Sequence, residues 1–169
     1  MTIKTDQSIK ESAMKNLSIL ILVLLSFLIS NCEKNSENKQ TSCFQLDLDD
    51  PTGYDLTNKW IFLGIIYQSR IELCKPENLK EMNIEFNDTN YFSGASACNS
   101  IFGNYYTSNP DSIIIERLLK TMIFCMNDTV REWEEKYCTG LRYATNFDIL
   151  GNRLKIRTNA SYDLIFRAD

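Results

Sequence analysis

The side chains that could carry chemistry in this sequence are its six cysteines and its carboxylates, because the chain contains no histidine. Without imidazole there is no Ser-His-Asp or Cys-His catalysis, and no zinc site that depends on histidine. Carboxylate chemistry is still allowed. The cysteines form no C-x-x-C pair, which argues against both a thioredoxin-like redox centre and a zinc knuckle. Their role therefore depends on the compartment in which the chain resides.

The beginning of the chain is typical of an exported protein. Three lysines precede an apolar run at residues 17–29, and this run is shorter than the roughly 20 residues that cross a membrane. A basic start followed by a short apolar run predicts a secretory signal peptide over residues 1–31. The signal is complete from Met14 onward, which favours Met14 as the initiator and residues 1–13 as an upstream extension.

Cys32 follows the signal as the last residue of I-S-N-C, which resembles a bacterial lipobox. In a lipobox the cysteine is diacylated and becomes the mature N-terminus. Asn31 is looser than the usual Gly, Ala or Ser, so a plain signal peptide cleaved nearby is the alternative. Residues 32–43 should form a disordered tether, because residues 33–42 contain no apolar side chain. We therefore predict a lipoprotein of the bacterial cell envelope, attached to a membrane through Cys32.

The composition excludes several kinds of partner. Residues 1–31 carry three of the 18 basic and two of the 22 acidic residues, which leaves 15 basic and 20 acidic residues and a net charge of −5. This balance offers no basic face for nucleic acid. The acidic run at residues 46–53 lacks the glycine and glutamate that an EF-hand requires at its sixth and twelfth positions. No phosphate-binding glycine loop occurs either, so we predict neither a metal nor a cofactor.

Apolar patterning predicts several short strands and one helix, an α+β fold of one domain. Residues 68–80 are polar, contain Pro76 and predict a long loop. We expect about seven or eight strands. They are drawn from residues 59–67, 82–86, 91–97, 101–106, 112–116 with the continuation 118–124, 147–149, 154–156 and 162–167.

A helix of roughly 14 residues is predicted after an N-cap at residues 127–129. Val130, Trp133, Tyr137 and Leu141 recur at helical spacing and form one apolar stripe, which we expect to pack into the sheet. Gly140 is expected to end this helix. Cys138 lies at the edge of the apolar stripe, which favours a buried free thiol.

No group of residues in the sequence predicts a catalytic site. Glu132 and Glu135 could act as an acid–base pair, but glutamates on a polar helix face are far more often solvated surface. Met122, Phe124 and Met126 could form a soft binding surface, but apolar residues in a strand and its continuation are more often core. We therefore predict no catalytic residue.

The stretch from Phe92 to Cys125 carries an ordered set of residues that resembles a known family. Its members are Phe92, Gly94, Cys98, Asn99, Gly103, Tyr105, Thr121 and Cys125. Their pattern, G-x-x-x-C-N-x-x-x-G-x-Y and then T-x-x-x-C, is similar to that of the META domain, the family of HslJ-like heat-shock lipoproteins of bacteria. Trp60 and the hairpin F-x-I-x-G-x-x-L-x-I extend the resemblance over about residues 58–167.

The resemblance implies that an antiparallel sheet curls around the helix as an incomplete barrel, within a domain over residues 44–169. It also implies a disulfide between Cys98 and Cys125, because both stand in the family motifs. Closing this loop would contribute roughly 3–4 kcal/mol in the chain-entropy model. Among the other cysteines three connectivities remain possible, and we prefer Cys43 with Cys74.

Two classes of function remain. The first is a non-catalytic envelope lipoprotein that binds a protein or supports the envelope, and the association of the family with heat-shock and antibiotic stress favours it. The alternative is a small hydrolase or thiol enzyme, or a binder of an apolar ligand between sheet and helix. The first is preferred, because the sequence shows no group of residues that would place an acid or Cys138 in a catalytic pocket. Asn99, Asn104 and Thr121 are expected to bond nearby backbone rather than a substrate.

Overall fold

The computed structural model describes residue 44 and residues 53–169. The predicted signal peptide, the predicted lipidation at Cys32, the tether and Cys43 lie outside the described residues. Within the described part of the chain, no helix has the length and apolarity that crossing a membrane requires.

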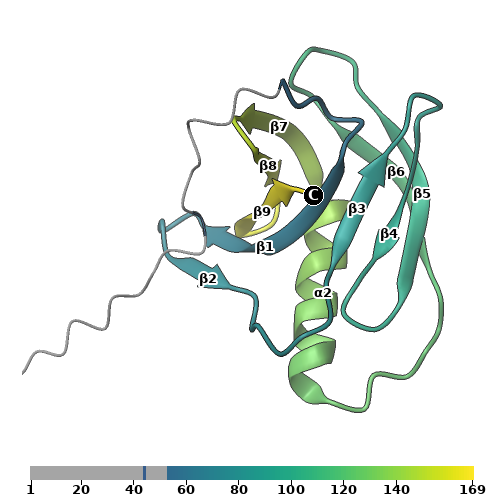
Figure 1. Cartoon of the computed structure of the whole chain (residues 1–169), viewed down its shortest axis with the longest axis vertical. Helices are drawn as coiled ribbons and strands as arrows, with labels where there is room; N and C mark the ends of the chain where they lie inside the picture. Colours follow the sequence, from purple (N-terminus) through teal and green to yellow (C-terminus); the bar gives the residue numbers. More distant parts are fainter. Residues whose placement is uncertain (1–43, 45–52) are drawn as a thin grey trace, which may run out of the picture. The chain divides into compact units, whose positions relative to one another are not determined.

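Nine strands and one helix make up the described domain (Figure 1). In chain order they are β1 (Lys59–Tyr67), β2 (Glu72–Cys74), β3 (Asn83–Phe86), β4 (Tyr91–Ala95), β5 (Ser100–Tyr106), β6 (Ile114–Lys120), α2 (Asp128–Arg142), β7 (Ala144–Leu150), β8 (Arg153–Thr158) and β9 (Tyr162–Ala168). The sheet order is β6-β5-β4-β3-β1-β9-β8-β7, and β2 pairs with β1. All of these strand pairs are antiparallel.

The sheet curls into an incomplete barrel, as Figure 1 shows for the strands around α2. Among the described residues, the residues just before β6 meet β7 where Ser112 bridges Asn146 and the Ile113 N–H donates to the Thr145 carbonyl at 2.9 Å. The helix packs against β6, β8 and β9. The predicted α+β fold with an incomplete barrel is confirmed.

The apolar stripe of α2 packs into the concave face of the sheet. Phe62 of β1 lies with its ring centroid 6.1 Å from that of Trp133 and 4.9 Å from that of Tyr137. Phe166 of β9 completes the cluster, and the Tyr137 hydroxyl donates to the Asn83 carbonyl at 2.9 Å. Phe62 therefore occupies the space beside Trp133 and Tyr137 where an apolar ligand was considered.

Two details of the sheet differ from the expectation. The short strand β2 falls inside residues 68–80, which were predicted as loop, and pairs with residues 64–66 of β1. Three residues are too few to produce a recognisable alternation, so pairing alone defines this strand. In place of the expected pieces 112–116 and 118–124 there is one strand, β6, which begins at Ile114 and ends at Lys120 rather than at Phe124.

The prediction that Gly140 ends the helix is wrong. The helix continues to Arg142, and Tyr143 is its C-cap residue. Gly140 is buried, and a Cβ atom at this position would lie 2.5 Å from Leu164 Cδ2 of β9. A glycine is therefore required here by close packing of the helix on β9.

We expect Gly140→Ala to destabilise the domain by about 1–3 kcal/mol, the usual cost of adding a methyl group to a filled core. Helix propensity acts in the opposite direction, because alanine is favoured over glycine inside a helix by about 1 kcal/mol. Urea unfolding measures the difference. Glu132→Ala on the exposed face is the control and should change stability by less than about 0.5 kcal/mol. A Gly140→Ala variant as stable as the wild type would contradict the packing argument.

Candidate functional site

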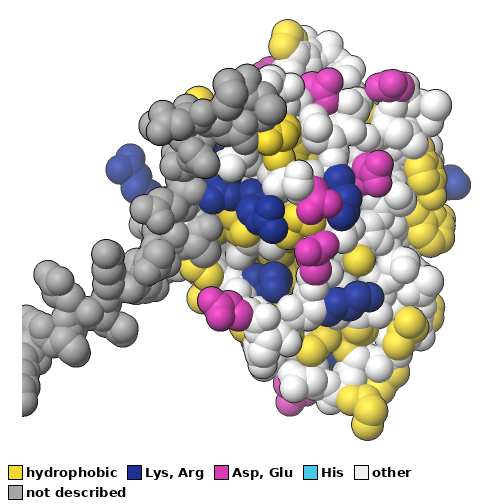
Figure 2. Space-filling view, viewed as in Figure 1, with side chains coloured by type: hydrophobic (Ala, Val, Ile, Leu, Met, Phe, Trp, Pro, Cys, Tyr) yellow, Lys and Arg dark blue, Asp and Glu magenta, His cyan; other side chains and the backbone are white. Residues whose placement is uncertain are grey.

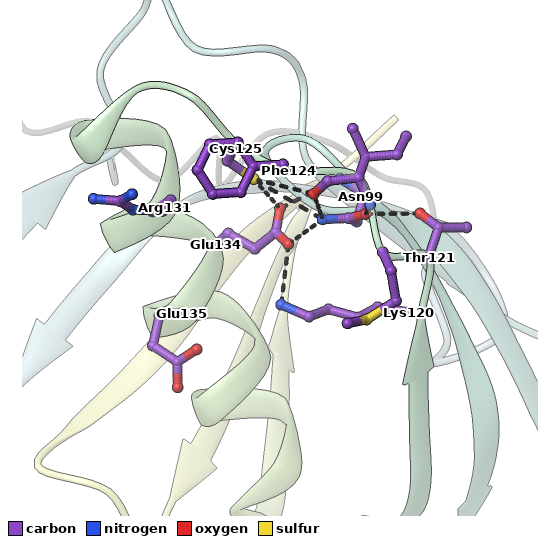
Figure 3. A pocket seen from close by; sticks show the side chains of 10 residues that line it. Asn99, Lys120, Thr121, Phe124, Cys125, Arg131, Glu134 and Glu135 are labelled. Atoms are coloured by element: carbon purple, nitrogen blue, oxygen red, sulfur yellow. Dashed lines mark hydrogen bonds and ion pairs between the residues drawn. The ribbon is translucent and has the colours of Figure 1, made fainter.

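Three residues of the signature, Cys98, Asn99 and Cys125, lie around one carboxylate, that of Glu134 in α2 (Figure 3). This side chain is buried, with the residue only 2% exposed. Its Oε2 accepts hydrogen bonds from Ser96 Oγ at 3.0 Å and from the backbone N–H groups of Cys98 at 2.9 Å and Asn99 at 3.3 Å. Its Oε1 accepts from Asn99 Nδ2 at 2.6 Å and from Lys120 Nζ at 3.2 Å. A buried charge is thus paired and hydrogen-bonded on both oxygens.

Asn99 connects this carboxylate to the segment that follows β6. Its Oδ1 accepts from the Ile123 N–H and from Thr121 Oγ1, both at 2.8 Å. Its Nδ2 also donates to the Ile123 carbonyl at 3.3 Å. The expectation that the Asn99 side chain bonds nearby backbone is wrong, because its partners are the backbone of Ile123 and the carboxylate of Glu134.

The structure joins Cys98 and Cys125 by a disulfide, with their Cα atoms 6.1 Å apart. The bridge attaches the β4–β5 connection to the segment after β6, beside the Asn99 contacts. Cys74 is also disulfide-bonded, while Cys43, its predicted partner, lies outside the described residues. Cys138 is a buried free thiol, and burial raises its pKa to about 11. It is therefore protonated at neutral pH and is a poor nucleophile.

The other signature residues shape the sheet next to this network. Gly94 and Gly103 lie where a Cβ atom would collide with the backbone of Asn83 and Arg117 on neighbouring strands. Tyr105 is buried and donates to the Asn87 carbonyl at 2.8 Å. These residues position β4 and β5, and they do not touch the carboxylate.

Burial alone would raise the pKa of Glu134, because a low-dielectric surrounding disfavours its charged form. Hydrogen bonds from Asn99, the Cys98 N–H, Ser96 and Lys120 act in the opposite direction and together lower this pKa below the ordinary glutamate value. The carboxylate therefore remains ionised at neutral pH.

Residues 122–126, here called the apolar segment, project four of their five side chains into solvent. Met122 is 91% exposed, Ile123 62%, Phe124 76% and Met126 88%, whereas Cys125 is buried. Figure 2 shows hydrophobic side chains gathered at the lower right, where the chain passes from β6 to α2 in Figure 1. The interpretation of these residues as core is wrong, because the strand stops at Lys120 and Asn99 redirects the chain.

A pocket of about 360 Å³ lies between the apolar segment, the end of β6 and α2. Lys120, Arg131 and Glu135 add charges of both signs to its lining. Figure 3 shows that the Glu134 carboxylate points toward Asn99 and Cys125, whereas Arg131 and Glu135 point away from this cluster. The pocket thus combines an apolar wall with polar groups that are already paired with one another.

Sequence reasoning placed Glu132 and Glu135 on a solvated surface, as the structure shows, but it missed the one buried glutamate of this helix. Glu132 and Glu135 are exposed, and the buried Glu134 between them was not singled out. A signal was present, because Glu134 lies four residues after Val130 and three before Tyr137, on the apolar stripe itself. An acidic residue on such a stripe requires a buried partner.

The fold and this site define a small α+β domain in which a half-barrel and a helix are joined by a buried polar network and a disulfide. The model of the META domain family matches residues 68–169, and the chain belongs to this family. The resemblance in the sequence is thereby confirmed.

Solved structures that are similar to this chain include the following two. The NMR structure of a protein from Burkholderia xenovorans has a TM-score of 0.55 at 16% identity, covering 70% of this chain and 91% of that one. The crystal structure of a DUF4847 family protein from Bacteroides vulgatus has a TM-score of 0.51 at 15% identity, covering 68% and 94%. At these identities the likeness shows the fold alone. A comparison with curated proteins found no match.

We predict that Glu134→Gln destabilises the domain by about 3 kcal/mol at neutral pH, because it disrupts a buried, hydrogen-bonded ion pair. A lowered folded-state pKa contributes stability above the ordinary glutamate pKa of about 4.3, and this contribution is lost as the pH falls through the folded-state value. Unfolding free energy measured from pH 7 downward should therefore fall more steeply for the wild type than for Glu134→Gln. Glu135→Gln is the exposed control. Identical acid profiles for wild type and Glu134→Gln would disprove this role of the carboxylate.

Proposed function

We propose that this chain is a non-catalytic lipoprotein of the bacterial envelope whose META domain binds a partner protein through the apolar segment. The observation that carries the proposal is the exposure of four large apolar side chains, between 62% and 91%, on a segment whose backbone is held in place. Exposed apolar patches on an otherwise well-packed domain commonly mark interaction sites.

The state of the polar groups supports a non-catalytic role. The Glu134 carboxylate accepts five hydrogen bonds from neighbouring protein groups and stays ionised, so it is poorly suited to exchange protons with a substrate. Cys98 and Cys125 are oxidised, and Cys138 is buried with a raised pKa. Thiol or buried-carboxylate chemistry would therefore find these described groups already committed to other bonds or protonated.

The apolar segment is prepared for binding because its backbone is already ordered. Asn99 holds both backbone polar groups of Ile123, and the disulfide holds Cys125. Ordering a flexible residue costs about 1–2 kcal/mol, and a segment fixed before association avoids much of this cost. Phe124 and the two methionines could then act as anchors in an apolar hollow of the partner.

The charges around the apolar segment favour a protein partner over a lipid surface. Lys120, Arg131 and Glu135 line the pocket beside the apolar segment, and Arg131 pairs with Asp128, so the rim is of mixed sign. An apolar centre with a polar rim is the usual anatomy of a protein interface. An anionic bilayer would repel the carboxylates on the first turns of α2.

The remaining part of the proposal concerns location. A lipid on Cys32 would keep the domain at a membrane and raise its effective concentration near envelope proteins. The association of HslJ-like proteins with heat-shock and antibiotic stress favours a role in supporting the envelope under stress. The partner is accordingly expected to be a protein of the same compartment.

The lipid attachment predicts a specific mass. The full chain, recovered from the native membrane fraction, should begin at Cys32 and carry acyl chains, as intact-mass spectrometry would show. Cys32→Ser should lose the acyl mass and leave the membrane fraction. A wild-type chain that is cut elsewhere and unacylated would refute the lipoprotein assignment while leaving the binding role of the domain untouched.

If a partner protein binds the apolar segment, a photo-crosslinker placed on this segment should attach to that partner. A photo-crosslinking residue placed at Phe124 or Met126 of the full chain, in cells, should yield one protein adduct of the same size. Met122→Ser should reduce its yield severalfold, because a contacting apolar side chain is lost. A crosslinker at Tyr143, which is 52% exposed at the other end of α2, is the matched control and should yield no such adduct. Adducts with lipid alone, or the same adducts from Tyr143, would argue against a protein interface here.

A further inference from the structure

The apolar segment carries a methionine at each end, and both methionines are almost fully exposed. Met122 is 91% and Met126 is 88% exposed, and they lie on either side of Phe124 in the chain. An oxidant reaches an exposed methionine sulfur far more readily than a buried one. We propose that Met122 and Met126 form an oxidation site, at which hydrogen peroxide converts the apolar segment into a polar surface and so releases a bound partner. The release of a partner rests on the proposed function of this segment.

The other sulfur atoms of the described residues are protected from such an oxidant. Three cysteines are held in disulfides, namely Cys74, Cys98 and Cys125. Cys138 is buried, and its pKa of about 11 keeps it in the less reactive thiol form. Met82, the remaining methionine of the described residues, is 0% exposed. Sulfur oxidation of the folded domain is therefore directed to the two methionines of the apolar segment.

The reaction is a two-electron transfer of oxygen. A lone pair of the methionine sulfur attacks one oxygen of hydrogen peroxide, the O–O bond breaks, and an S–O bond forms. The second oxygen takes up the proton of the first and leaves as water, so the sulfur loses two electrons and the peroxide gains them. Methionine sulfoxide reductases reverse the change with a dithiol as co-reactant, which becomes a disulfide while the oxygen leaves as water. The modification is therefore reversible.

A sulfoxide changes what the apolar segment can bind. The thioether of methionine is flexible and apolar and fits an apolar hollow, whereas a sulfoxide is polar and accepts hydrogen bonds. Burying its oxygen without a donor should weaken docking by roughly tenfold or more for each methionine. The contacts that hold the backbone, at Ile123 and Cys125, involve neither thioether. Oxidation should therefore alter the surface of the domain and leave its fold intact.

Peptide mapping of the isolated full chain tests the modification site. In the folded chain treated with hydrogen peroxide, Met122 and Met126 should each gain one oxygen atom at least about tenfold faster than Met82. The melting temperature should stay the same. Urea should abolish the difference in rate, because unfolding exposes Met82. Equal rates in the folded chain, or unfolding that accompanies oxidation of Met122 and Met126, would overturn the proposal.

Crosslinking tests the release of the partner. With the photo-crosslinking residue at Phe124, hydrogen peroxide given to the cells should lower the yield of the partner adduct roughly tenfold or more. A double variant, Met122→Leu with Met126→Leu, should give the same yield before and after peroxide, whatever its starting level. Met82→Leu, a swap that conserves volume in the core, should lose the adduct as the wild type does.

Two outcomes separate the failure of this switch from the failure of docking. An adduct that persists when peptide mapping shows both Met122 and Met126 oxidised would overturn the switch and leave docking by the apolar segment intact. A chain that gives no adduct even before peroxide would contradict docking, and the release of a partner would fall with it. The peptide map then decides the oxidation site by itself.

Discussion

The buried charge of Glu134 is the constraint on which the rest of this domain depends. An ionised carboxylate in a protein interior is costly unless donors surround it. Here the donors come from the β4–β5 connection and from the end of β6, whereas the carboxylate belongs to α2. Helix and sheet can therefore meet in only one arrangement near the N-terminal half of α2. The aromatic cluster around Phe62 adds apolar contacts between helix and sheet and constrains this arrangement less sharply.

The same network explains why apolar side chains are found outside the core. Asn99 uses one end of its amide for Glu134 and for the Ile123 carbonyl, and the other end for the Ile123 N–H. The chain after Lys120 is thereby held against Asn99 instead of continuing as a strand, and the disulfide at Cys125 keeps it there. The buried side chain of Asn99 therefore fixes the backbone in a path that leaves Met122 and Phe124 exposed to solvent. The buried polar network and the exposed apolar side chains both result from these hydrogen bonds.

Much of the fold was predictable because it is encoded by short-range patterns. The apolar run at residues 59–67 coincides with β1, and the Asn127 side chain caps α2 by accepting from the Val130 N–H at 3.2 Å, as its residue type predicts. The apolar segment was misassigned because its composition equals that of a core strand. Apolar composition favours burial of a segment, but it does not show whether the fold buries it. Here the hydrogen bonds of Asn99 to Ile123 hold the segment outside the core.

By itself the sequence determined the class of the fold, the inward face of the helix and the family, because each depends on periodicity or on a spaced set of residues along the chain. Three features were decided only by the tertiary structure. Glu134 accepts hydrogen bonds from Asn99 and Cys98, and Gly140 packs closely against Leu164. The apolar segment, apart from Cys125, is exposed to solvent. The physical reason is that each of these facts joins groups far apart in the chain. Local patterns specify which side of an element is buried, but a partner is specified only when the elements have packed.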